Sequence, residues 1–324
     1  MRIIQTTAPG GPENLGVAEA PTPTPAPGEV LIEVRACGVN RADLLQRRGH
    51  YPPPPGASDV IGLEVSGVIA ATAPDVTGWA IGDPCVALLA GGGYAEYVAV
   101  ASGQVVRPPD GVDLVTAAGL IEVAATVVSN FDHVRLAAGE TVLIHGGAGG
   151  IGTFAIQYAK ALGARVVVTA GTPAKLELCR ELGADVALDY HEDWVAGLKT
   201  ATDGHGADVI LDVMGAAYLE KNVAALALDG RLVVIGLQGG RSGTLDVARL
   251  LNKRGTVTAT SLRGRPSVQK AEICAAVEAQ VWPLIESGKI RPAPETRFAF
   301  ADVADAHRHL DSGDNTGKVL LTLD

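Results

Sequence analysis

A cluster of glycines between two regular elements is the part of this chain best suited to bind a ligand. Residues 141–152 read Thr-Val-Leu-Ile-His-Gly-Gly-Ala-Gly-Gly-Ile-Gly, and an apolar-periodic segment follows. Three of the glycines have the G-x-G-x-x-G spacing of a dinucleotide-binding turn, where they allow a tight reversal and let a pyrophosphate approach the backbone at a helix start. The residues expected at the pyrophosphate are Gly147, Gly149, Gly150, Ile151 and Gly152.

The next segment indicates which dinucleotide would bind. Folds selective for NAD place an Asp or Glu about 20 residues beyond the glycines, where it accepts hydrogen bonds from the ribose hydroxyls. No acidic residue stands between Glu140 and Glu177. Gly171, Thr172 and Lys175 stand there instead, and their backbone, hydroxyl and ammonium suit a ribose 2′-phosphate. We therefore predict NADPH rather than NADH, the alternative being that Lys175 is an ordinary solvated lysine in the first turn of a helix.

The chain has two parts that differ in composition and in the pattern of apolar residues. Residues 1–113 are rich in Pro and Gly and carry short β-like runs, which predicts a mainly antiparallel β domain. Residues 114–262 alternate helical and strand segments, which predicts a doubly wound parallel sheet. The six strands expected there are 141–145, 165–169, 186–188, 209–213, 231–235 and 256–260. The fold class is therefore α/β.

The last part of the chain is expected to return to the first domain. A helix over 267–287, a short run at 298–300, a helix over 303–312 and a final strand over 318–323 follow the last strand of the parallel sheet. We therefore predict a catalytic domain of residues 1–113 and 263–324, a nucleotide domain of residues 114–262, and a cleft between them.

Composition limits the function classes. The 26 basic and 36 acidic residues give a net charge of −10, and no basic run is longer than Arg47-Arg48, so no footprint for nucleic acid or an anionic membrane is expected. Four scattered cysteines without a C-x-x-C pair fit a reduced, cytoplasmic compartment better than a disulfide scaffold. We expect no segment able to span a bilayer, because even the apolar stretch 114–129 contains Glu122.

Several further motifs carry a family resemblance over nearly the whole chain. They are Gly10–Leu15, Asn40–Leu44, Tyr51–Ala57, Ile61–Glu64, Gly139–Lys160, Glu220–Asn222, Ala227–Arg231 and Gly317–Val319. With them the chain resembles the zeta-crystallin-like quinone oxidoreductases of the zinc-free medium-chain dehydrogenase/reductase superfamily, and most closely the tumour-suppressor-inducible branch. The resemblance implies a Rossmann domain with a GroES-like domain, NADPH as hydride donor, a small quinone as acceptor, and a homodimer joined near Thr256–Thr260.

Site residues follow individually from this resemblance. Asn40 and Asp43 match positions beside the nicotinamide and the substrate, and Tyr51 matches a pocket position that could stack on a quinone or relay a proton; a capping pair and a loop-packing tyrosine are the alternatives. Three more residues match cofactor positions: Thr126, Tyr190 and Lys318. Because carboxyl ends of parallel strands line the cofactor crevice, we add Met214, Gly215, Gly236 and Leu237.

No metal is expected. Zinc enzymes of this superfamily carry a cysteine where this chain has Asn40 and a histidine where it has Leu63, and neither side chain supplies a thiolate or imidazole. A quinone needs little electrophilic help, because its reduction yields a phenolate-like anion whose conjugate acid has a pKa of about 10. Catalysis is then expected mainly from proximity.

Three functions remain open. The first is an NADPH:quinone reductase that transfers a hydride or single electrons. The second is a zinc-free reductase of α,β-unsaturated carbonyls or enoyl thioesters, because Val123-Ala124-Ala125 are smaller than the residues usual in the family. The third is a binding or structural protein with little turnover.

Overall fold

A computed structural model describes residues 1–323 of the chain, which divide into two compact units. The first unit comprises Met1–Ala125, Leu262–Gly288 and the chain from Pro292 onward. The second unit comprises Thr126–Ser261 with the short segment Lys289–Arg291. Relative to the limits expected from sequence, residues 114–125 and Leu262 group with the first unit and 289–291 with the second.

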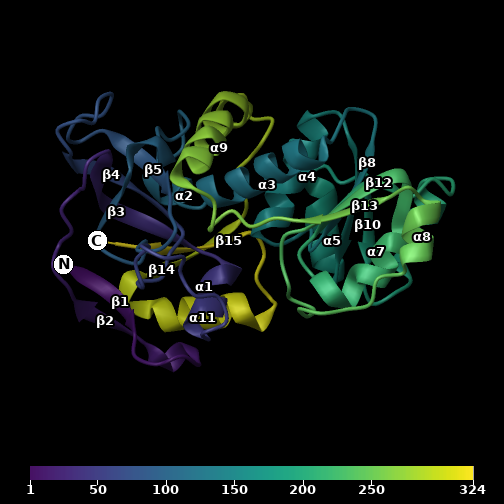
Figure 1. The fold of residues 1–324 in the computed structure, drawn as a ribbon, viewed down its shortest axis with the longest axis horizontal. Coiled ribbons are helices and arrows are strands. Elements are labelled where there is room, and N and C mark those ends of the chain that lie inside the picture. Colours follow the sequence, from purple (N-terminus) through teal and green to yellow (C-terminus); the bar gives the residue numbers. More distant parts are fainter. Residues whose placement is uncertain (324) are drawn as a thin grey trace. The chain divides into compact units, whose positions relative to one another are not determined.

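The second unit, coloured from teal to green in Figure 1, is built on a six-stranded, wholly parallel sheet. The order of its strands is β10-β9-β8-β11-β12-β13. The strands are β8 (Thr141–His145), β9 (Arg165–Ala170), β10 (Val186–Asp189), β11 (Ala207–Asp212), β12 (Leu226–Val234) and β13 (Thr256–Ala259). Every residue of β8 is buried, as expected for a strand covered on both faces. The order reverses beside β8, so the carboxyl ends of β8 and β11 flank the switch point where such sheets bind ligands. This confirms the predicted Rossmann-type sheet.

Helices connect these strands, and two of the helices end at a glycine. They are α3 (Ile121–Val134, which crosses the unit boundary), α4 (Gly150–Ala161), α5 (Pro173–Glu181), α6 (Trp194–Ala201), η3 (Gly215–Tyr218), α7 (Leu219–Ala225) and α8 (Val247–Asn252). The backbone turns left-handed just past α4 and α5, at Gly163 (φ +81°) and Gly183 (φ +106°). These are the glycine caps that the sequence predicts.

The first unit contains a mainly antiparallel sheet in the order β14-β15-β3-β4-β5-β7, with β6 also paired to β3. Its strands are β3 (Glu29–Val39), β4 (Glu64–Thr72), β5 (Pro84–Leu88), β6 (Tyr97–Ala101), β7 (Val105–Val106), β14 (Glu295–Ala299) and β15 (Lys318–Thr322). The pair β14–β15 is parallel and the others are antiparallel. The second predicted part of the fold class, a GroES-like sheet, is thereby confirmed.

The other elements of this unit surround the sheet. They are a hairpin of β1 (Arg2–Thr6) and β2 (Leu15–Glu19), helices α1 (Arg41–Arg47), α2 (Leu114–Ala117), α9 (Ser267–Gln280), α10 (Trp282–Glu286) and α11 (Val303–Ser312), and the 3-10 turns η1 (Pro12–Asn14), η2 (Ser102–Gln104) and η4 (Phe300–Asp302). The single helix expected over 267–287 was wrong: it breaks at Val281. Pro283 lacks the N–H that a continuous helix would use there.

One stretch, Leu114–Val134, is long and apolar enough to cross a membrane, so the expectation that no such stretch exists was wrong. Of its most apolar part, 72% is buried inside the protein, as is usual for a core helix. All four cysteines are buried and unbonded to one another: Cys37, Cys85, Cys179 and Cys274.

Candidate functional site

The glycine turn between β8 and α4 leaves a backbone surface without side chains. A Cβ on Gly147 would lie 2.9 Å from Cys179 Sγ, and one on Gly152 would lie 2.3 Å from the carbonyl oxygen of Gly146. Both contacts exclude any larger residue. A Cβ on Gly149 would meet nothing closer than 3.5 Å, so the protein itself does not require glycine there. The turn therefore fits a pyrophosphate: two glycines close it, and the third leaves space above it.

A buried histidine supports this turn from below. His145 Nδ1 lies 2.9 Å from Thr169 Oγ1, and its Nε2 lies 2.7 Å from Asn222 Oδ1. Because the amide oxygen of Asn222 only accepts, Nε2 carries the proton and Nδ1 accepts from Thr169. Its edge contacts Trp194, with ring centroids 4.9 Å apart. Burial lowers the pKa of His145 to about 4, so the ring is neutral beneath the turn.

The end of β9 brings together the residues predicted for the 2′-phosphate. Thr172 is the N-cap of α5, and its hydroxyl accepts the N–H of Lys175 at 3.3 Å. The hydroxyl of Tyr190, at the end of β10, occupies the space of a Gly171 side chain, since a Cβ there would lie 2.2 Å from it. Tyr190 is 43% exposed, so its ring is available to cover a ligand. Gly171, Thr172, Lys175 and Tyr190 thus form one surface.

One carboxylate does lie near this surface, on the neighbouring strand. Asp189 pairs with Ala170 in the register of β10 and β9. Its Oδ1 accepts the backbone N–H of His191 at 2.9 Å and lies 2.8 Å from Nδ1 of that ring. These hydrogen bonds hold the pKa of Asp189 below its usual range. The carboxylate is therefore engaged by His191 and is not presented as a ribose acceptor.

The loops after β11 and β12 are joined to each other. Asp212 accepts the N–H groups of Met214 (2.7 Å) and Gly215 (3.0 Å), and the carbonyl of Met214 accepts the N–H of Gly239 at 2.7 Å. Gly236 packs so closely that a Cβ would lie 2.6 Å from the carbonyl oxygen of Val213. The next residue, Leu237, is half exposed. The four predicted residues Met214, Gly215, Gly236 and Leu237 therefore lie in two contacting loops.

Thr126, the other residue predicted in the second unit, lies on α3 and is buried. Its carbonyl oxygen accepts the side-chain amide of Asn130 at 2.7 Å. Asn130 in turn accepts the hydroxyl of Thr260 at 2.6 Å. The helix is thereby tied to the end of β13.

In the first unit, three neighbouring strands bring Asn40, Glu64 and Lys318 together. β3 lies between β15 and β4 and runs antiparallel to both, so its end meets the starts of the other two. Lys318 begins β15, Glu64 begins β4, and Asn40 directly follows β3. Lys318 Nζ lies 2.6 Å from Glu64 Oε1 and 2.8 Å from Asn40 Oδ1, and Asn40 Nδ2 donates to Glu64 Oε1 at 2.9 Å. The lysine and glutamate are buried, while Asn40 is partly exposed.

Asp43 continues this cluster into the interior. Its Oδ2 accepts the N–H of Asn40 at 2.7 Å and the hydroxyl of Tyr94 at 3.2 Å, while Oδ1 is buried without a hydrogen bond within residues 1–323. Desolvation raises the pKa of Asp43 to about 7. The series of hydrogen bonds continues from the Tyr94 hydroxyl to His307 Nε2 (3.1 Å), and from His307 Nδ1 to Arg47 (3.2 Å). Because Asp43 has no exposed surface, it can act only through its neighbours.

Tyr51 is held by an arginine that the sequence did not single out. Arg263 donates to the carbonyl oxygens of Ala90 (2.7 Å) and Tyr51 (3.1 Å) and to Gln46 Oε1 (2.7 Å). Its guanidinium also lies over the Tyr51 ring, 5.1 Å from the centroid. The aromatic ring is therefore fixed to a buried cation rather than carried by a free loop.

The residues present at the superfamily's zinc positions do not fit a metal. Both polar atoms of the Asn40 amide bond to Lys318 and Glu64, and Leu63 is a buried aliphatic side chain. Over residues 1–323, no three His, Cys, Asp or Glu side chains gather in a way that could hold an ion. An ammonium already neutralises the carboxylate where a cation would have to bind.

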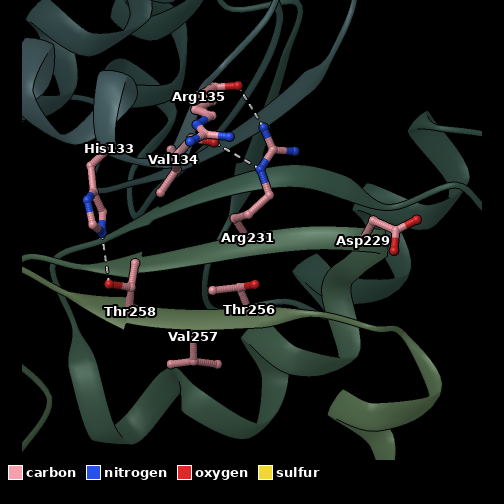
Figure 2. A pocket seen from close by; sticks show the side chains of 8 residues that line it. All are labelled: His133, Val134, Arg135, Asp229, Arg231, Thr256, Val257 and Thr258. Carbon is pink, nitrogen blue, oxygen red and sulfur yellow. Dashed lines mark hydrogen bonds between the residues drawn. The ribbon is translucent and has the colours of Figure 1, made fainter.

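A separate open groove of about 670 Å³ lies along the edge of the parallel sheet (Figure 2). It is lined by His133, Val134, Arg135, Asp229, Arg231, Thr256, Val257 and Thr258. Arg231 crosses to the end of α3, where it donates to the carbonyl oxygens of Val134 (3.0 Å) and Arg135 (2.9 Å), and it also pairs with Glu140. Its guanidinium is thus used structurally. The groove follows β13, whose outer side pairs with no other strand in the described part of the chain.

Several members of these clusters were not found from sequence. Glu64, Tyr94, Arg263 and His307 come from four distant parts of the chain, so no local spacing links them. Only Glu64 could have been suspected, since an acidic residue in an apolar strand needs a partner when buried. That partner, Lys318, was predicted at the cofactor; the structure places its ammonium on Glu64 and Asn40.

Comparison with known families places both parts of the chain. The family described as "Alcohol dehydrogenase GroES-like domain" matches residues 26–110, and the family described as "Zinc-binding dehydrogenase" matches residues 150–277. These matches fall on the antiparallel sheet and on the parallel sheet respectively.

Whole-chain relatives agree with the family matches. A quinone oxidoreductase of Pseudomonas aeruginosa is 34% identical over 322 residues, covering 98% of each chain. The crystal structure of Escherichia coli quinone oxidoreductase complexed with NADPH matches with a TM-score of 0.91 at 29% identity, covering 100% of both chains. A polyketide synthase subunit of Mycobacterium tuberculosis is 30% identical over 322 residues, which cover 99% of this chain and 15% of that protein.

Proposed function

Because the chain belongs to the quinone oxidoreductase family of the medium-chain dehydrogenase/reductase superfamily, we propose that it is a zinc-independent NADPH:quinone reductase. The observation that carries this proposal is the surface formed by Gly171, Thr172, Lys175 and Tyr190, which offers a hydroxyl, an ammonium and an aromatic ring to an adenosine 2′-phosphate. The relative solved with NADPH supports the same cofactor.

The second unit would hold the dinucleotide along the carboxyl edge of its sheet. The turn from Gly147 to Gly152 takes the pyrophosphate, since its backbone N–H groups open α4. Thr126 and the joined loops at Met214–Gly215 and Gly236–Leu237 take the nicotinamide half. Bound NADPH supplies the hydride. The protein's own residues bind and orient it, and a lysine rather than a carboxylate at Lys175 selects the phosphorylated form.

The first unit would hold the acceptor. We assign Asn40 as a hydrogen-bond donor to a quinone oxygen and Tyr51 as the aromatic surface on which the flat ring stacks. Asp43, being buried, positions Asn40 through its backbone N–H. No strong acid is needed, because a hydroquinone anion takes its proton from water: its conjugate acid has a pKa of about 10.

Two further properties belong to the same proposal. The unpaired edge at β13, beside the groove of Figure 2, is the surface at which a second copy of the chain would extend the sheet into a homodimer. The four free, buried cysteines support a reducing, cytoplasmic location.

The deciding experiment is stopped-flow oxidation of NADPH and NADH against ortho-quinones, para-quinones, enals and crotonyl thioesters, with and without a chelator. We expect NADPH oxidation with quinones that the chelator leaves unchanged. Equal rates with NADH would contradict the assignment of Lys175, and loss of activity with the chelator would contradict zinc independence. If no acceptor oxidised NADPH, the remaining function would be that of a binding protein with little turnover.

Two observations favour a second function. The 30% identity to a segment of a polyketide synthase subunit, together with the small buried residues Val123, Ala124 and Ala125, supports reduction of an α,β-unsaturated thioester. Faster turnover of crotonyl thioesters than of quinones in the same panel would select it.

A further inference from the structure

The amide of Asn40 has only one orientation consistent with its partners. A lysine ammonium can only donate, and a carboxylate oxygen can only accept. The amide atom 2.8 Å from Lys318 Nζ is therefore the oxygen, and the atom 2.9 Å from Glu64 Oε1 is the nitrogen. The nitrogen carries two hydrogens, and one remains after the bond to Glu64. Within residues 1–323 no second acceptor is bonded to Asn40 Nδ2.

The carboxylate that fixes this orientation is itself fully engaged. Glu64 Oε1 accepts from Lys318 and Asn40, and Oε2 accepts the backbone N–H of Glu122 at the start of α3 (3.0 Å). Its negative charge is thus met by an ammonium and by the positive end of a helix. The pair is buried, with side chains 7% and 0% exposed for Lys318 and Glu64.

Two glycines leave room for this pair. A Cβ on Gly38, in β3, would lie 2.1 Å from Glu64 Oε1. A Cβ on Gly119 would lie 3.2 Å from Lys318 Cε and 3.1 Å from the neighbouring Leu320. The site is therefore shaped on both sides for a carboxylate and an ammonium whose shared contact is the Asn40 amide.

We propose that Lys318 and Glu64 are positioning residues that fix the Asn40 carboxamide so that its remaining N–H is offered to the carbonyl oxygen of the acceptor. This inference rests on the proposed function, and it specifies which group of the acceptor is recognised. Without Lys318 the amide oxygen loses its donor, so the carboxamide is held only through its bond to Glu64 and can swing its remaining N–H away from the acceptor oxygen. The effect of Lys318 on turnover must then pass through Asn40.

A double-mutant cycle tests this dependence. Asn40→Ala, Lys318→Met and the double variant are compared by kcat and KM for one quinone at saturating NADPH. We expect each single change to lower kcat/KM about tenfold, the cost of one hydrogen bond to the acceptor oxygen as negative charge develops on it. The double variant should lose no more than Asn40→Ala alone. Multiplying losses would overturn the proposal, because they would mean that Lys318 acts independently of Asn40.

A second readout does not depend on turnover. In protein labelled with ¹⁵N asparagine, the side-chain amide signals of Asn40 are identified by their loss in Asn40→Ala. Lys318→Met should shift them and speed their exchange with water, because the amide loses its anchor. Unchanged signals would overturn the proposal. NADPH affinity, followed by its fluorescence, should stay the same in all variants.

Controls separate this result from misfolding and from failure of the proposed function. Lys270→Met removes another buried lysine of the same unit and should leave kcat/KM unchanged. If Lys318→Met does not fold, the charge-free pair Glu64→Gln with Lys318→Gln replaces it, and its loss must again vanish in the Asn40→Ala background. A wild-type protein inert toward every quinone would reject the proposed function, whereas an active wild type with a multiplicative cycle would reject only this inference.

Discussion

The hydroxyl of Tyr94 donates to Oδ2 of Asp43 at 3.2 Å in the interior of the first unit. Oδ2 also accepts a backbone N–H, so it is an acceptor in this network. The oxygen of Tyr94 must then accept from Nε2–H of His307, and Nδ1 of His307 accepts from Arg47. In this series of hydrogen bonds Arg47 donates to His307, His307 to Tyr94, and Tyr94 to Asp43. His307 is therefore neutral and carries its proton on Nε2.

This assignment predicts an acid-sensitive stability. Burial, and then the nearby charge of Arg47, lowers the pKa of His307 to about 3. In the unfolded chain a histidine binds a proton near pH 6.5, so the stability contributed by the neutral ring is present above that pH and is lost as the pH falls below it. We expect His307→Gln to flatten the fall in the free energy of unfolding between pH 7 and 4.5, measured by urea titration.

The matched control for this series is His50→Gln, which changes an exposed histidine and should leave the pH dependence as it is. A His307→Gln curve parallel to that of the wild type would contradict the assignment.

Asp43 should make the free energy of unfolding depend on pH in the opposite direction to His307. Its pKa is raised to about 7 by desolvation, whereas an aspartate in the unfolded chain ionises near pH 3.9. The protonated native state therefore adds stability below the unfolded pKa, and this contribution is lost as the pH rises through 7. Asp43→Asn, which cannot ionise, should gain stability relative to the wild type from pH 5 to pH 8. The same urea titrations measure it, and a constant difference between the two proteins would contradict the raised pKa.

The glycine turn allows a test that separates binding from folding. Gly149→Ala adds a methyl group with no protein atom closer than 3.5 Å, so the Tm should not change. If the pyrophosphate passes over this position, the methyl group displaces it, and the Kd for NADPH should rise at least about tenfold.

Calorimetry of NADPH binding and thermal unfolding are the measurements for this variant. Gly264→Ala, at another position with no atom within 4 Å, is the control and should bind NADPH normally. Normal NADPH affinity in Gly149→Ala would place the phosphates elsewhere.

Lys175 should determine the choice between the two cofactors. Lys175→Met removes the ammonium while keeping much of the side-chain length, so the Kd for NADPH should rise about 10- to 100-fold, as expected for the loss of one charge-assisted hydrogen bond. The Kd for NADH should not move. Lys199→Met, an exposed lysine on α6, serves as the control in the same titrations. Equal weakening of both cofactors would show that Lys175 does not contact the phosphate.

Local patterns predicted most of the nucleotide-binding unit. The continuous apolar run of β8, the glycine spacing after it and the caps at Gly163 and Gly183 each depend on residues adjacent in sequence. Such short-range signals leave few alternatives for a parallel sheet. A helix was likewise predicted near residues 303–312, where α11 (Val303–Ser312) lies.

The polar cluster of the first unit could not be predicted in the same way. Asn40, Asp43 and Lys318 were identified through the resemblance, but Glu64, Tyr94 and His307 were not, because they come from a strand, a loop and a helix that are far apart in the sequence. The antiparallel pairing of β15, β3 and β4 brings Glu64 and Lys318 to Asn40. Helix α1 (Arg41–Arg47) and the β1–β2 hairpin were also not expected, because both lie in the Pro- and Gly-rich part where periodicity is weak.

The position of β15 between β14 and β3 has a consequence for how the protein is made. Lys318 meets Asn40, which lies 278 residues earlier in the chain. On the ribosome, the six parallel strands emerge complete before β15 is synthesised, so the nucleotide-binding unit is free to fold first. In the other sheet, strands β3 to β7 are synthesised earlier. The edge of β3 that pairs with β15 therefore has no partner until β15 has been made.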